Sequence, residues 1–164
     1  MEKTFHSILK IGCHIEHALK DAMVLCQSWG YNGFKRLYRY YNNCIHHDLI
    51  CLRNEMFDNH DIVAIDEYPT TPYLAANLKE HCEKWLMTLR DACRQLAMLN
   101  VELVKQTGYQ SCEVKDILKD LYKLKEKARR TLVRFEKCNW MEHDIHVYDD
   151  LLHHKMKKKE EKHK

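Results

Sequence analysis

Glycine and proline are scarce in this chain, which contains only 4 Gly and 2 Pro among 164 residues. Folds built from strands and turns use both residues often, so their scarcity favours long helices over a β-rich fold. The sequence also lacks any apolar run of about 18 residues, and we therefore expect no membrane-spanning helix. With 45% hydrophobic residues, a chain of this length has enough apolar side chains for the core of one domain.

Motifs of several functional classes are absent as well. None of the 8 cysteines forms a Cys-x-x-Cys pair, which argues against a zinc finger or ribbon. There is no nucleophile elbow, phosphate-binding loop or dinucleotide fingerprint. The first residues, MEKTFHSILK, lack a secretory signal, so we expect a cytoplasmic protein with reduced thiols. A net charge of +3 is weak, and we expect neither nucleic acid nor a membrane as a partner.

The segment 33–57 carries the clearest helical pattern. Its apolar residues recur at spacings of three and four, which places them on one face of a helix. They are Phe34, Leu37, Tyr41, Ile45, Leu49, Leu52 and Met56. Asp48 lies near the middle of this face, between Cys44 and Cys51. Because an unpaired buried carboxylate is costly, Asp48 needs a partner, which is either a metal ion or a basic side chain.

Similar patterns predict three further long helices, so the expected fold class is all-α. The four helices span about 4–28, 33–59, 73–107 and 112–138. A tight turn with two glycines joins the first two, whereas 58–72 is a long connection that suits a crossover travelling the length of a bundle. Gly108 is expected to end the third helix, and Ser111 is expected to be the N-cap residue of the fourth. On the fourth helix, Lys125 is expected near the centre of the inward face.

The chain is expected to divide into a four-helix bundle over 1–140 and a C-terminal region over 141–164. Apolar residues between 139 and 152 predict a short fifth helix or tail. The run that follows, HHKMKKKEEKHK, is rich in His and Lys, and we expect it to be a solvated, frayed end.

Three stretches resemble the ferritin-like superfamily. HIEHALKDAMVLCQSWG resembles the first helix of ferritins and bacterioferritins, and GFKRLYRYYNNCIHHDLICL resembles their second. LKDLYKLKEKARRTL lies where the fourth helix of that group carries its metal motif. The resemblance covers most of residues 5–138. It implies a ferritin-like four-helix bundle with a long crossover between its second and third helices, self-assembly, and a link to iron storage or detoxification.

The resemblance fails at the positions that bind iron. The di-iron centre of the family takes carboxylates from all four helices and Glu-x-x-His motifs from two of them. The corresponding positions here are Glu16, Ile45 and Asp48, Arg90 or Asp91, and Tyr122 and Lys125. Only the first helix keeps its Glu, and a cation at a ligand position repels iron. The resemblance therefore implies a lost or degenerate ferroxidase centre with no cofactor bound at the bundle centre, and we lean against an enzyme.

A cluster of buried charges is the expected replacement for the metal centre. Glu16, Asp48, Lys125 and Arg90 project toward the same region on their predicted helices. Removing one member of such a cluster would cost roughly 3–5 kcal/mol, because the other charges would lose their partners. The alternative is that Lys125 extends to the surface and Glu16 lies at the edge of its apolar face.

Two other groups have the spacing of metal ligands. His47 and Cys51 are one helical turn apart, although they project away from the apolar face and are more simply explained as surface side chains. His146, Asp150 and His153 also follow one-turn spacings and would hold a metal only where an oligomer supplies further ligands.

Several apolar residues point away from the predicted core, and we interpret them as a subunit interface. They are Ile11, Leu25, Tyr40, Ile50, Phe57, Met87, Met98 and Val101. A symmetric dimer is the commonest assembly of this kind.

The leading functional hypothesis is a structural shell subunit with iron as a stored mineral. Its partners would be copies of itself, in a dimer at least and possibly a cage, or an active ferritin-like subunit. The alternative is a metal-independent helical scaffold or interaction protein. A third hypothesis is a di-iron enzyme with the unusual ligands Glu16, Asp48, His47 and Cys51.

Overall fold

The computed structural model describes residues 1–63, 65 and 67–162. The described residues form α-helices and no β-strand, so the prediction of an all-α fold is confirmed. The helices are α1 (Glu2–Ser28), α2 (Asn32–His60), α3 (Leu78–Thr107), α4 (Cys112–Lys137) and α5 (Glu142–Lys162). None of the helices in this described part combines the length and the apolar character needed to cross a membrane.

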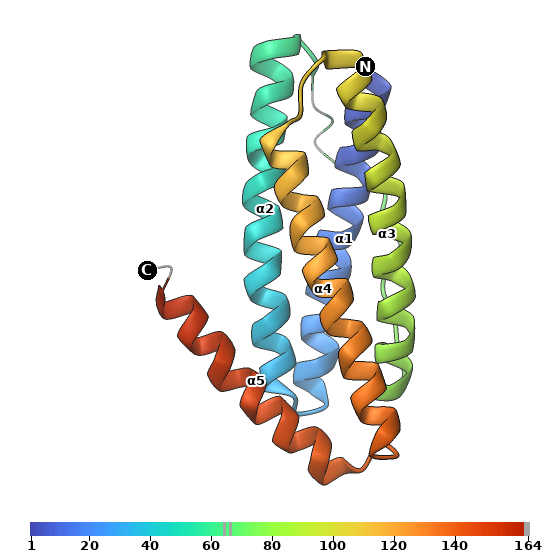
Figure 1. The fold of residues 1–164 in the computed structure, drawn as a ribbon, viewed down its shortest axis with the longest axis vertical. Coiled ribbons are helices and arrows are strands. Elements are labelled where there is room, and N and C mark those ends of the chain that lie inside the picture. Colours follow the sequence, from blue (N-terminus) through green and yellow to red (C-terminus); the bar gives the residue numbers. More distant parts are fainter. Residues whose placement is uncertain (64, 66, 163–164) are drawn as a thin grey trace.

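Helices α1 to α4 lie side by side along the long axis of the molecule (Figure 1). In that view α1 and α4 run downward, while α2 and α3 run upward. Helix α1 contacts α2 and α3, and α4 also contacts α2 and α3. Every one of these neighbouring pairs is therefore antiparallel, and the two parallel pairs stand on the diagonals.

The connection between α2 and α3 runs along α1. Near the start of α1, the Tyr68 hydroxyl forms a 2.8 Å hydrogen bond with Nδ1 of His6. Further along, the backbone N–H of Tyr73 donates to Oδ2 of Asp21 at 2.9 Å. His6 and Asp21 are about 22 Å apart along the axis of α1, at 1.5 Å per residue. The connection returns the chain from one end of the bundle to the other, so that α3 starts beside the end of α1 (Figure 1).

Side-chain caps define where α3 and α4 begin. Asn77 accepts a 2.9 Å hydrogen bond from the backbone N–H of Glu80, and α3 starts at the next residue, Leu78. The predicted start at Tyr73 is wrong because Tyr73 belongs to the connection and is buried there. Ser111 caps α4 as predicted, and Gly108 ends α3 in the left-handed conformation at φ 80°.

Aliphatic side chains fill the middle of the bundle interior. Ile15 of α1, Ile45 of α2 and Leu89 of α3 are fully buried. Helices α1 and α2 approach closely at Gly12, where a side-chain methyl group would overlap the side chain of Leu49. A larger residue at this contact between helices would force the Leu49 side chain to move.

The inward face of α4 agrees with the prediction except at two positions, where the residue before the predicted one faces the core. Leu124 and Thr131 are buried, whereas Lys125 and Leu132 are only half-buried. The inward residues alternate between spacings of three and four, which is the pattern of helices that wind around each other. They are Val114, Ile117, Leu121, Leu124, Ala128, Thr131 and Phe135. A shift of one residue turns a side chain by about 100°, which removes Lys125 from the centre.

Helix α5 is longer than predicted and packs against α2. The expected frayed end after Leu152 is wrong, because the helix continues to Lys162. Met156 is only 1% exposed and anchors this extension. Glu160 accepts ion pairs from Arg36 at 3.4 Å and from Arg39 at 3.6 Å. These contacts come from a distant segment, so the local charge pattern does not reveal them.

Helix α5 also caps the start of α2. No side chain of α2 or of Tyr31 caps this end. Asp149 of α5, which is 4% exposed, accepts a 3.0 Å hydrogen bond from the backbone N–H of Phe34 and another from Gly33. A side chain at Gly33 would overlap the backbone oxygen of Asp149. The carboxylate thus satisfies helix N–H groups that would otherwise lack partners.

Candidate functional site

The residues predicted to form the core charge cluster do not come together. Glu16 is 9% exposed, but its Oε1 lies 2.5 Å from Nδ1 of His46 and 3.6 Å from Nζ of Lys20. Lys20 is an exposed residue of α1, and His46 is an exposed residue of α2. The partners of the Glu16 carboxylate therefore lie at the surface between α1 and α2. The side chains at the bundle centre are aliphatic.

The other three members lie in separate environments. Asp48 is half-buried between α2 and α4; burial, together with the negative charges of Asp116 and Asp120, raises its pKa to about 6. The ammonium of Lys125 lies 4.7 Å from the centre of the Tyr122 ring. Arg90 is exposed. The predicted buried cluster is wrong, because α4 presents Leu124 and not Lys125 to the interior.

The candidate metal ligands have other neighbours. His47 Nε2 and Cys51 Sγ lie 3.7 Å apart on the surface of α2. His146 lies 3.5 Å from Glu142, and His153 lies 3.3 Å from Arg36. Asp150 is exposed. Among the residues that the structure describes, no group of three His, Cys, Asp or Glu side chains is arranged to hold a metal ion.

A buried histidine that the sequence patterns did not single out lies near the start of α3. His81 is 0% exposed, and both of its ring nitrogens have tyrosine partners. The Tyr38 hydroxyl lies 2.7 Å from Nε2, and the Tyr73 hydroxyl lies 2.9 Å from Nδ1. The rings of Trp29 and Trp85 pack beside the imidazole. This network ties α1, α2, α3 and the connecting segment together at one end of the bundle.

The hydrogen-bond directions in this network fix the tautomer of His81. The Tyr73 hydroxyl donates to the backbone oxygen of His81 at 3.1 Å, so it can only accept from Nδ1–H. Tyr38 then donates to Nε2. Burial lowers the pKa of His81 to about 4, which keeps the ring neutral at neutral pH. The network is closed to solvent and has a structural role.

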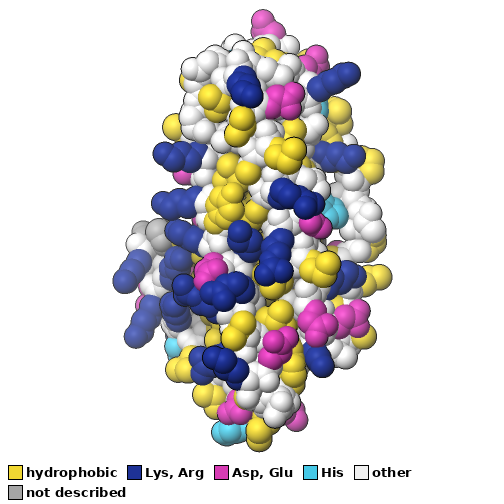
Figure 2. Space-filling model, turned by 45° about the vertical axis from the view of Figure 1, so that its right-hand side comes forward, with side chains coloured by type: hydrophobic (Ala, Val, Ile, Leu, Met, Phe, Trp, Pro, Cys, Tyr) yellow, Lys and Arg dark blue, Asp and Glu magenta, His cyan; other side chains and the backbone are white. Residues whose placement is uncertain are grey.

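A groove on the outside of α4 is the most distinctive feature of the surface. Its volume is about 730 Å³. It is lined by Tyr41, Lys115, Leu118, Lys119, Tyr122, Lys123, Glu126, Lys127 and Arg130. Figure 2 shows Lys and Arg side chains gathered on the lower left and middle of this face, around patches of hydrophobic side chains. A signal was present in the sequence, since Lys recurs every fourth residue from 115 to 127.

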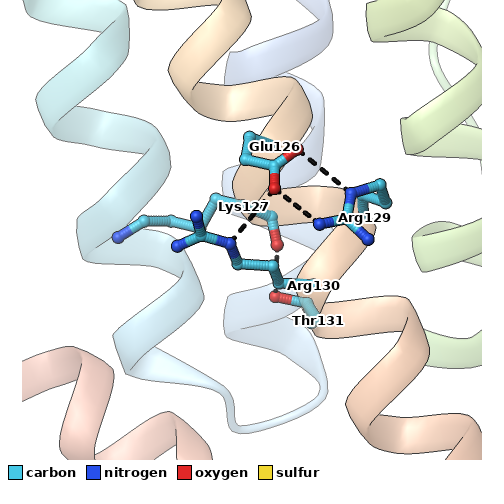
Figure 3. A network of polar contacts seen from close by, with 5 residues as sticks. All are labelled: Glu126, Lys127, Arg129, Arg130 and Thr131. Carbon is cyan, nitrogen blue, oxygen red and sulfur yellow. Dashed lines mark hydrogen bonds and ion pairs between the residues drawn. The ribbon is translucent and has the colours of Figure 1, made fainter.

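Positive charges converge at one end of this groove. Burial, together with the positive charges of Lys155, Lys159 and Arg130 nearby, lowers the pKa of Lys127 to about 8. The carboxylate Glu126 also lines the groove, but it accepts hydrogen bonds from Arg129 at 2.6 Å and from Arg130 at 3.2 Å (Figure 3). The groove is thus suited to hold a negatively charged ligand, and none of its residues has the arrangement of a nucleophile and base.

Known proteins give no further guide to this site. No protein-family model matches the sequence, and no curated protein matches it. The chemistry of the groove and the packing of the bundle are therefore the basis for a functional hypothesis.

Proposed function

We propose that this protein is a metal-independent, self-associating helical scaffold built on a ferritin-like arrangement of helices. The observation that carries the proposal is the aliphatic interior at the level where the resemblance would place two iron ions. The proposal favours the interaction-protein alternative over an iron-storing shell subunit.

The path of the chain supports the ferritin-like part of the proposal. Ferritin-like bundles have one long crossover connection among four helices. Here the long connection lies between α2 and α3, follows α1 through the contacts of Tyr68 and Tyr73, and leaves antiparallel neighbours throughout. The short turns between α1 and α2 and between α3 and α4 agree with the same topology.

The packing of the interior argues against a di-iron centre. Such a centre needs several carboxylates and imidazoles directed at a shared point. The residues that face the centre are instead Ile15, Ile45 and Leu89. The side chain of Leu49 packs directly against Gly12 and fills the space between α1 and α2. Glu16 is directed to His46. The residues present do not fit the metal centre that the resemblance implies.

A second groove supports self-association. It has a volume of about 880 Å³ and lies between α1, the connecting segment and α3. Exposed Met98 lies on its α3 side, together with the two carboxylates Asp91 and Glu102, and Lys10 lies on its α1 side. A surface that carries apolar groups and both signs of charge can pair with a second copy of itself across a two-fold axis.

Light scattering coupled to size-exclusion chromatography tests the proposal. We expect a dimer, and we expect Met98→Glu to give a monomer with an unchanged helical circular dichroism spectrum. Val24→Glu, an equally exposed position on α1 outside this groove, is the matched control and should remain dimeric. A monomeric wild-type protein would reject self-association, and a mass many times that of the chain would favour a cage.

Aerobic addition of ferrous iron tests the second part. The rate of ferric product formation should equal that of buffer alone. Rapid oxidation that disappears in Glu16→Ala would reject the metal-independent interpretation.

A further inference from the structure

The α4 groove has a regular spacing of charge. Lys115, Lys119, Lys123 and Lys127 follow one another at intervals of four residues along α4. Four residues of an α-helix rise about 6 Å, so the four ammonium groups span about 18 Å of the helix. The first three lysines are exposed, and Lys127 is half-buried at the end of the row. We call these four residues the lysine row.

An apolar strip accompanies the lysine row. Leu118 and Tyr122 are also four residues apart, and both line the groove together with Tyr41 of α2. Tyr122 is 44% exposed, and Leu118 is half-buried against the core. The groove therefore offers a strip of apolar surface with a parallel row of positive charge, both with the repeat of an α-helix.

The far side of the groove adds cations from α5. The ammonium of Lys159 lies 4.8 Å from the centre of the Tyr40 ring and 5.4 Å from that of Tyr41. Lys155 and Lys159 both lie close enough to act electrostatically on Lys127.

The carboxylates of this region balance these charges only in part. Asp120 lies near Lys119, Lys123 and Lys159, and the carboxylate of Asp116 is close to it. Glu126 is engaged by Arg129 and Arg130, whose contacts are drawn in Figure 3. At the Lys127 end, Lys155, Lys159 and Arg130 all place positive charge near the ammonium. Like charges held together at a half-buried position repel each other, and an anionic partner would relieve that repulsion.

We propose that the α4 groove binds an acidic amphipathic helix of a partner protein, with Glu or Asp at four-residue intervals and an adjacent apolar strip. The match is geometric, because rows of residues four apart on two α-helices run parallel to each other when the helices cross at about −50°, the commonest packing angle. Each carboxylate of the partner then meets one lysine of the row, and its apolar side chains cover Leu118 and Tyr122. A nucleic-acid duplex would use the cations but leave the apolar strip facing water, and a single strand would stack bases on Tyr122 but leave Leu118 uncovered, so the helix is the better match.

Fluorescence anisotropy with synthetic peptides tests the inference on the full-length protein. The probe is a labelled peptide of about 16 residues, about 24 Å long as a helix, with Glu at every fourth position and Leu on the adjacent strip. The control peptide has the same composition, with its Glu residues distributed around the helix. We expect the probe to bind at least about tenfold more tightly than the control, since the match of spacing is lost in the control.

Charge reversal in the protein provides the second arm. Lys119→Glu combined with Lys123→Glu should weaken binding of the probe at least about tenfold, because two attractions become repulsions. The matched control combines Lys3→Glu with Lys105→Glu, which changes the net charge equally at exposed positions on α1 and α3. This control should bind as the wild type does. Circular dichroism verifies that both variants are folded.

Three outcomes would overturn the inference. The first is equal binding of the probe and the control peptide, which would indicate attraction by net charge alone. The second is equal loss of binding in the two double variants. The third is tighter binding of a labelled oligothymidylate that displaces the probe, which would identify a nucleic-acid groove. None of these readouts depends on the oligomeric state, so they are independent of the proposed dimer.

Discussion

The buried His81 predicts a specific dependence of stability on pH. In the folded protein burial lowers its pKa to about 4, from an ordinary value of 6.5. The unfolded chain therefore binds a proton that the folded protein excludes when the pH lies between these two values. The free energy of unfolding contributed by this residue is fully present above about pH 6.5 and is lost as the pH falls toward 4.

The size of this contribution follows from the two pKa values. At about pH 4.5, protonation of His81 in the unfolded chain lowers the free energy of unfolding by about 2.5 kcal/mol. At about pH 7.5 this loss is close to zero. Replacing the imidazole by an amide in His81→Gln removes the titration. The free energy of unfolding of the wild type should therefore fall by about 2.5 kcal/mol more than that of the variant between these two pH values.

Urea unfolding followed by circular dichroism at both pH values measures the four free energies. The change in the free energy of unfolding between the two pH values is compared for the wild type and His81→Gln. This comparison removes the constant cost of placing glutamine in the core, and it also removes the contribution of carboxylates that titrate in both proteins. His17→Gln is the matched control, because His17 is exposed on α1. It should show the same fall as the wild type. Equal falls for wild type and His81→Gln would refute the reasoning, since they would mean that His81 binds its proton equally well in the folded protein.

Three further substitutions test other parts of the structure. Tyr38→Phe removes the hydroxyl that donates to Nε2 of His81 and should destabilise the fold by about 1–3 kcal/mol, seen as a lower urea midpoint; an unchanged midpoint would mean that this nitrogen has another partner. Gly33→Ala places a methyl group against the backbone of Asp149 and should cost about 1–3 kcal/mol. Its α5 should become more sensitive to trypsin, as followed by mass spectrometry, and wild-type cleavage rates would contradict the predicted overlap. Asp48→Asn should stabilise the protein by about 1 kcal/mol at about pH 7.5 and hardly at all near pH 4, because a raised carboxyl pKa means that stability is lost as the pH rises from about 4 to about 6. A constant effect at both pH values in urea titrations would point to a contact other than charge.

The sequence was sufficient for features that depend on neighbouring residues. The scarcity of Gly and Pro and the apolar spacings predicted an all-α chain, and Ser111 and Gly108 marked two helix ends correctly. These features follow from local backbone and side-chain geometry, which short segments determine. The apolar character of Tyr73 predicts a start of α3 that is five residues too early, because Tyr73 packs in the connecting segment.

The candidate site depended on details that a pattern in one sequence does not fix. Assigning Lys125 to the interior in place of Leu124 required an error of only one residue on α4, yet it moved a charge from the surface to the centre. His81 escaped notice because its two partners, Tyr38 and Tyr73, come from another helix and from the connecting segment. The lysine row was readable in the sequence, but its convergence with Lys155 and Lys159 required knowledge that α5 packs beside it.

The cap that Asp149 provides has a consequence for how the molecule is made. Phe34 and Asp149 are 115 positions apart in the chain. A polypeptide emerging from the ribosome completes α2 long before the carboxylate that satisfies its first turn has been synthesised. That end of α2 lacks its cap throughout translation of α3 and α4, and it gains the cap only when the last helix docks. Maturation of this end is therefore a late event, and a nascent chain stalled before α5 exposes it to proteases.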